Sequence, residues 1–347
     1  MTPKTRYFLV GAAALLLLGL AGGLIAYYGM PGIGAFSSEP AELVYVPANA
    51  AAVAFANVHE IMNSEVRQQL RQMRPARAAS ADVEVWRRFE EQTGITVETD
   101  VEHLLAYVVP ATEREGQSDA VMLARGHFDQ ARVERLAEQQ GGTLETYQGK
   151  RILVHRRNRS ATGPSNPESP IPNPGKNSEM AVAFIQPGLV AVGTNAAVRR
   201  SLDLGSGQGS DMTTNDDFMR LIRDSDEGNV WAVGSFERIN GHVPLPQNLM
   251  NNLPAVTYFA VTGQIASGVS GRLRAQTRDA QAVRNLSDVV RGFIAFGKLQ
   301  TGARPELQTV LESLQLQSED NAGTVSFALP SSALQALAQR QPERKGQ

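Results

Sequence analysis

The feature that most constrains this chain is a run of 21 uncharged residues, Phe8 to Tyr28, that contains four consecutive leucines. As a helix the run would be ~31 Å long, which matches the hydrocarbon core of a bilayer. Lys4 and Arg6 precede it, and the next Lys or Arg is Arg67. The positive-inside rule then places the N-terminus in the cytoplasm. We predict a single-pass helix that contacts the lipid bilayer of the inner membrane, with most of the chain periplasmic or extracellular.

The alternative to a membrane anchor is a cleaved signal peptide, because such peptides also begin with a charged segment. The run is longer than the usual apolar core of roughly 7 to 15 residues, and Leu24 to Ala26 offers only a poor cleavage site. Gly19 to Gly23 follows the small-residue pattern that lets two membrane helices approach closely, so a homodimer is left open. We therefore assign residues 1–38 to a cytoplasmic tip, a transmembrane helix and a short linker.

Composition excludes several functional classes. The chain has 347 residues, 33 Lys and Arg against 35 Asp and Glu, and no cysteine. A nearly neutral chain has no general attraction for nucleic acid, so we do not expect that partner. The lack of cysteine excludes disulfides, Cys-ligated zinc, iron–sulfur clusters and a thiol nucleophile.

Beyond the anchor, strand and helix signals recur in the same order in two halves of the chain. Val53 to Ile61 and Trp231 to Ile239 each join an apolar strand to a helix start. Asp129 and Asp279 each stand where they can cap a helix with apolar residues at helical spacing. We predict an α+β fold, in which two similar lobes of antiparallel sheet have helices packed on one face, and not a doubly wound parallel sheet.

The same signals place the boundaries between parts of the chain. We assign residues 39–205 to the first lobe, 206–340 to the second and 341–347 to a polar tail. Gly205 to Ser210 is rich in glycine and serine and is the predicted linker between the lobes. Asn158 to Ser178 contains five prolines and no apolar periodicity, so we expect a flexible insertion within the first lobe.

Several short motifs link the first half to a known family. These are Val46-Pro47-Ala48-Asn49-Ala50 before an apolar strand, Phe128-Asp129, Gly141-Gly142 and Tyr147-Gln148-Gly149. With them, residues 8 to 205 resemble an uncharacterised family of bacterial envelope proteins that have a membrane helix, a Leu-Pro-Ala-Asp-Thr-like opening and extracytoplasmic repeats. The resemblance implies an envelope location and brings no catalytic residues with it.

Motifs for catalysis and cofactors are incomplete. Gly292 to Lys298 has the spacing of a phosphate-binding loop, but Leu299 replaces its Ser or Thr and the apolar pattern favours a helix. His59 begins a near match to the zinc-protease helix, in which Asn63 replaces the second histidine. No Gly-x-Ser-x-Gly elbow occurs. We therefore predict no catalytic, cofactor-binding or metal-binding residues.

One dense basic cluster is a candidate contact for an anionic partner: Arg151, Arg156, Arg157 and Arg159. It could contact lipid headgroups, an anionic glycan or an acidic protein, and a solvated loop is the simpler alternative. The sequence thus favours a non-enzymatic protein that binds or organises envelope components. Two alternatives stay open, a carboxylate-based hydrolase of an envelope polymer and a carrier with an apolar cavity between sheet and helices.

Overall fold

The computed structural model describes residues 39–73, 90–110, 118–139, 141–155, 179–225, 227–239, 256–300 and 310–334. The predicted membrane helix Phe8 to Tyr28, the proline-rich insertion 158–178 and the tail 341–347 lie outside these residues. Within the described ranges no helix combines the length and the apolar character needed to cross a membrane.

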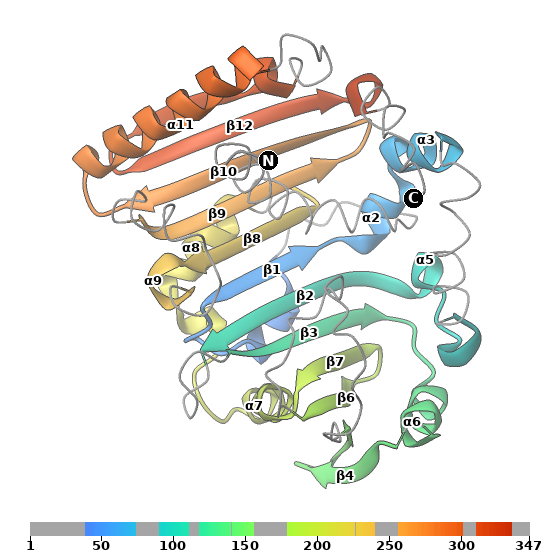
Figure 1. Cartoon of the computed structure of the whole chain (residues 1–347). Coiled ribbons are helices and arrows are strands. Elements are labelled where there is room, and N and C mark those ends of the chain that lie inside the picture. The colour runs from blue at the N-terminus through green and yellow to red at the C-terminus, as the bar shows by residue number, and fades with distance from the viewer. Residues whose placement is uncertain are drawn as a thin grey trace, which may run out of the picture.

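Twelve strands form one sheet in the order β11-β12-β10-β9-β8-β1-β2-β3-β7-β6-β5-β4, and every ladder between them is antiparallel (Figure 1). The strands are β1 Ala52–Ala56, β2 Val101–Pro110, β3 Ser118–Gly126, β4 Thr143–Tyr147, β5 Lys150–His155, β6 Met180–Gln186, β7 Leu189–Thr194, β8 Val230–Ser235, β9 Val256–Ile265, β10 Gly268–Thr277, β11 Gln315–Glu319 and β12 Ala322–Pro330. The predicted α+β class with antiparallel sheet is confirmed. Because β1 pairs with β8, residues 39–205 and 206–340 contribute adjoining parts of a single sheet.

Several of the described helices begin at a residue whose side chain caps the first turn. The helices are η1 Ala41–Tyr45, α2 Val58–Asn63, α3 Glu65–Met73, α5 Val97–Asp100, α6 Gln130–Gln139, α7 Asn195–Gly205, η2 Met212–Thr214, α8 Asp216–Ser225, α9 Phe236–Ile239 and α11 Ala280–Gln300. Asp129 accepts a hydrogen bond from the backbone N–H of Arg132, and Asp279 accepts one from that of Ala282. Both predicted caps are therefore confirmed, and each satisfies an N–H that the first turn leaves without a helical partner.

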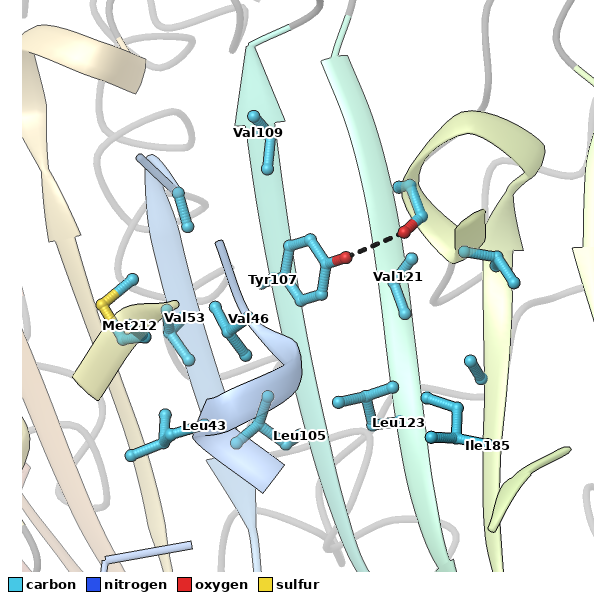
Figure 2. Close-up of a cluster of buried hydrophobic side chains, with 14 of the residues drawn as sticks. Leu43, Val46, Val53, Leu105, Tyr107, Val109, Val121, Leu123, Ile185 and Met212 are labelled. Carbon is cyan, nitrogen blue, oxygen red and sulfur yellow. Dashed lines mark hydrogen bonds between the residues drawn. The ribbon is translucent and has the colours of Figure 1, made fainter. Parts of the chain in front are cut away.

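One side of the sheet, which we call the first face, carries the main core (Figure 2). Val53, Leu105 and Val233 point into it, and η1, α7 and α8 cover it. The Tyr107 hydroxyl lies 2.8 Å from Ser201 Oγ and donates to the Ala197 carbonyl at 3.1 Å. Burial raises the pKa of Tyr107, so its ring is held in the core as a neutral phenol.

The opposite side, the second face, carries an apolar row that runs across all twelve strands. One residue from each strand lies in register: Leu144, Leu153, Val182, Val192, Met122, Ala106, Ala54, Ala232, Val261, Leu273, Val325 and Leu316. The parallel row on the first face turns polar beyond β9, at Arg274, Thr324 and Gln317. The second face is therefore the more continuously apolar of the two.

Helices lie on both faces of the sheet, so the predicted arrangement on one face is wrong. On the second face, the hydroxyl groups of Ser287 in α11 and Ser318 in β11 form a hydrogen bond, with 2.7 Å between their Oγ atoms. On the same face α6 contacts β5, where Glu134 lies 3.0 Å from Arg151. The reason is that the strands beneath α6 and α11 carry apolar residues on the second face as well, such as Leu153 and Val325, and these helices cover them.

The predicted linker between the lobes is a turn bound to the sheet. Gly207 and Gly209 have φ values of 78° and 102°, a conformation that glycine adopts at little cost. The backbone N–H of Ala48 donates to the Ser210 carbonyl at 3.0 Å. This turn therefore attaches the end of α7 to the segment that leads into β1.

Candidate functional site

A buried charged cluster lies at one end of the first face. Glu42 of η1 has a side chain only 3% exposed, and Arg125 of β3 donates to its Oε1 from Nε and Nη2 at 2.8 and 2.7 Å. His103 of β2 places Nε2 3.1 Å from Oε2 of Glu42, outside hydrogen-bond geometry. Burial raises the pKa of Glu42, but its contacts with His103 and Arg125 outweigh burial and lower the pKa to about 2. The carboxylate is therefore ionised at ordinary pH.

This cluster holds the chain in place and does not resemble a catalytic centre. Both Glu42 oxygens face basic groups, so the carboxylate is not available as a general base. Glu39, the first described residue, forms a second and more exposed contact with Arg223 at 3.2 Å. Together these contacts attach the segment that follows the predicted membrane helix to the sheet, through Glu42, and to α8, through Glu39.

A polar pocket of about 160 Å³ lies on the first face, where α8 meets β9 to β12. Asp224, Arg274 and Glu319 line it and are exposed. Arg272 also lines it and pairs with Glu227 at 2.6 Å. Charged, exposed side chains are typical of the solvent-facing side of an antiparallel sheet. We therefore interpret the pocket as part of a solvated surface.

The structure describes one residue of the predicted basic cluster, Arg151. Arg151 is half exposed and pairs with the buried Glu134 of α6. Arg156, Arg157 and Arg159 lie outside the described residues. A contact between these four residues and an anionic partner therefore stays a prediction.

The incomplete motifs all fall on helices. Gly292 to Leu299 is part of α11, as its apolar pattern predicted, and not a loop after a strand. His59 and Asn63 lie on α2. Among the residues that the structure describes, no group of three or more His, Asp or Glu side chains is placed to hold a metal ion.

The middle of the second face is the remaining candidate site. Figure 1 looks onto this face. Helices α2 and α3 pack at one end of it, where Ile61 and Val66 contact Ala56 and Val230, and none of the described helices lies across the row itself. Helix α8 lies behind β8 and β9. The apolar row is half-buried at Ala232, Ala54, Ala106, Met122 and Val192. Sequence reasoning missed this surface, although alternating large and small apolar residues in the central strands carried the signal.

Comparisons with known proteins add little to this geometry. No protein family model matches the chain, and no curated protein matches it. Among solved structures, crystal form I of TP0453 matches with a TM-score of 0.43 and 9% sequence identity, over 86% of this chain and 96% of that chain. A match at this level does not establish a shared fold or a shared function.

Proposed function

We propose that this chain is a membrane-tethered, non-enzymatic binding protein of a bacterial cell envelope. Its N-terminus would lie in the cytoplasm, and its sheet would lie on the outer side of the inner membrane. The uncharged run Phe8 to Tyr28 and the basic residues before it support this topology. Residues 29–38 connect that run to Glu39 and span at most ~36 Å when extended. Because Glu42 fastens η1 to the sheet, the binding surface would stay near the bilayer.

The observation that carries the binding function is the apolar row on the second face. Val192, Met122 and Ala106 are half-buried, and no described helix crosses the central strands beside them. Contiguous apolar surface on a soluble domain marks a site of interaction with a protein, ligand or membrane. We infer that this face binds an apolar partner, which favours a carrier or organiser over a hydrolase. Of the carboxylates that line the two candidate sites on the first face, Glu42 is paired with Arg125, and Asp224 and Glu319 are exposed.

We also propose that the sheet consists of two related halves. In the first, β1-β2-β3 is followed by α6, capped by Asp129, and then by β6 and β7. In the second, β8-β9-β10 is followed by α11, capped by Asp279, and then by β11 and β12. Both β7 and β12 lie beside the third strand of their own half, which supports the equivalence. The hairpin β4–β5 would be an addition to the first half.

Membrane fractionation of the full chain tests the anchor. After a carbonate wash the protein should remain in the membrane, and protease added from the outside should degrade all but a short N-terminal piece. A soluble mature form that begins near Tyr27 would contradict the proposal.

A second experiment tests the non-enzymatic assignment. The full chain in liposomes should show no turnover of peptidoglycan, polysaccharide, ester or phosphoester substrates, with or without divalent metal. Turnover that one Asp, Glu or His to Ala change abolishes in a folded protein would overturn the assignment.

A further inference from the structure

We propose that the central part of the apolar row holds the acyl chain of an anionic amphiphile. This inference rests on the proposed binding function and names the chemical class of the partner. It follows from the chemistry of the row, from its length and from where the chain places it relative to a bilayer.

The row offers only hydrocarbon and thioether groups to a partner. Ala106, Ala54 and Ala232 occupy three adjoining strands at its centre, and Met122 and Val261 flank them. The alanine side chains are shorter than those of Met122 and Val261 on either side, so the surface of the sheet is lower at the centre of the row. A linear alkyl chain can lie along this part of the row without burying an unpaired polar group, because the side chains of the row contain no polar group.

The length of the open part of the row suits a single acyl chain. On the second face α6 lies against β5, and α11 lies against β10, β11 and β12. Helices α2 and α3 border the row along the strands, at Ala56 and Val230, and do not divide it. From β7 to β9 there are five strand spacings, or ~24 Å at 4.7–4.9 Å each. The chains of one bilayer leaflet span ~15 Å, half of the hydrocarbon core. The acyl chain of one amphiphile therefore fits between these helices.

Position and charge favour a membrane amphiphile over other apolar partners. A tether of at most ~36 Å keeps the sheet close to the bilayer, where lipid is the most abundant apolar molecule. The β5 end of the second face carries His155, which is exposed, and Arg151, which pairs with Glu134 but keeps half of its side chain exposed. Both lie on the same side of β5 as Leu153. A carboxylate or phosphate headgroup at this end would meet basic side chains.

The absence of cysteine from the natural chain allows a direct test. Ala106→Cys places a thiol in the open row, and Ser326→Cys places one at a half-buried position of β12 on the first face. The full chain carrying either change is reconstituted in phosphatidylcholine liposomes. Its reaction with a water-soluble maleimide is followed with and without palmitate. A third variant, Ala54→Cys, repeats the test if Ala106→Cys fails to fold.

Palmitate should slow labelling of the cysteine at position 106 and leave that at position 326 unchanged. At ten times the Kd of palmitate the decrease should be about tenfold, because only the unoccupied fraction reacts. Hexadecanol, which lacks the negative charge, should protect less well, and palmitoyl lysophosphatidic acid should distinguish a phosphate headgroup from a carboxylate.

Two results would overturn the inference. Rapid labelling at position 106 that palmitate does not change would show an open face that binds no acyl chain. A thiol at position 106 that stays unreactive in both conditions would show that other residues of this chain, or a second copy, cover the face. A carbonate wash of the same liposomes keeps the proposals separate, since loss of the protein from the liposomes would contradict the membrane tether.

Discussion

Glu42 is a carboxylate with 3% of its side chain exposed, between an arginine and a histidine from neighbouring strands. Removing one partner of such a cluster leaves the others poorly paired, at a typical cost of 3–5 kcal/mol. Because Arg125 and His103 are 21% and 25% exposed, we expect Glu42→Ala to lower the free energy of unfolding by about 3 kcal/mol, the low end. Urea unfolding of the full chain measures the effect. Glu39→Ala is the matched control, since its contact with Arg223 is exposed and should contribute about 1 kcal/mol or less.

The same residue predicts a dependence of stability on pH. The pKa of Glu42 is about 2 in the folded chain, against 4.5 for an ordinary glutamate. Since folding lowers this pKa, the stabilisation is complete above about pH 4.5 and is lost as the pH falls toward 2. The difference in unfolding free energy between the natural chain and Glu42→Gln should shrink by about 3 kcal/mol across that window. A difference that stays constant between pH 5 and pH 2.5 would contradict the prediction.

Residues 158–178 connect two strands, β5 and β6, that pair directly with each other. His155 at the end of β5 pairs with Met180 at the start of β6, so the two strands are already adjacent where residues 158–178 connect them. Replacing 158–178 with a Gly-Asn turn should leave the sheet intact. It should stabilise the sheet by about 1–2 kcal/mol, because closing a shorter loop costs less conformational entropy. Denaturant unfolding measures the change. A loss of several kcal/mol would mean that the insertion contributes contacts to the folded chain.

Local elements could be predicted from the sequence more fully than their arrangement. The caps at Asp129 and Asp279 can be predicted because a capping side chain bonds a backbone N–H within the first turn of its own helix. The two faces of β2 could not be assigned, since Leu105 and Tyr107 alternate with the apolar Ala106 and Val108. The site at Glu42 had no local signal either, because Arg125 lies 83 residues away in sequence. Contacts of this kind depend on strand order, which periodicity does not supply.

At the scale of the whole molecule, the β1–β8 ladder determines how the two halves unfold. Val53 of β1 and Val233 of β8 are fully buried opposite each other, and both belong to the core that α8 covers. Separating the halves would expose this core and break the central ladder. We therefore expect one cooperative unfolding transition for the sheet, although its strands come from two predicted lobes.

Reporters placed in each half would test this cooperativity. Lys150 is exposed at the start of β5 and Glu319 is exposed at the end of β11, and the two strands lie near opposite edges of the sheet. The chain has no cysteine, so Lys150→Cys and Glu319→Cys each introduce a single thiol to label. With the same fluorophore on either thiol, the two urea unfolding curves should share one midpoint, because each half loses its buried neighbour when the other unfolds. A Val233→Ala change at the junction should lower both midpoints together, since it removes buried methyl groups from a core that both halves contribute to. Separate midpoints, or a shift in only one of them, would mean that the halves are independent domains joined by a weak ladder.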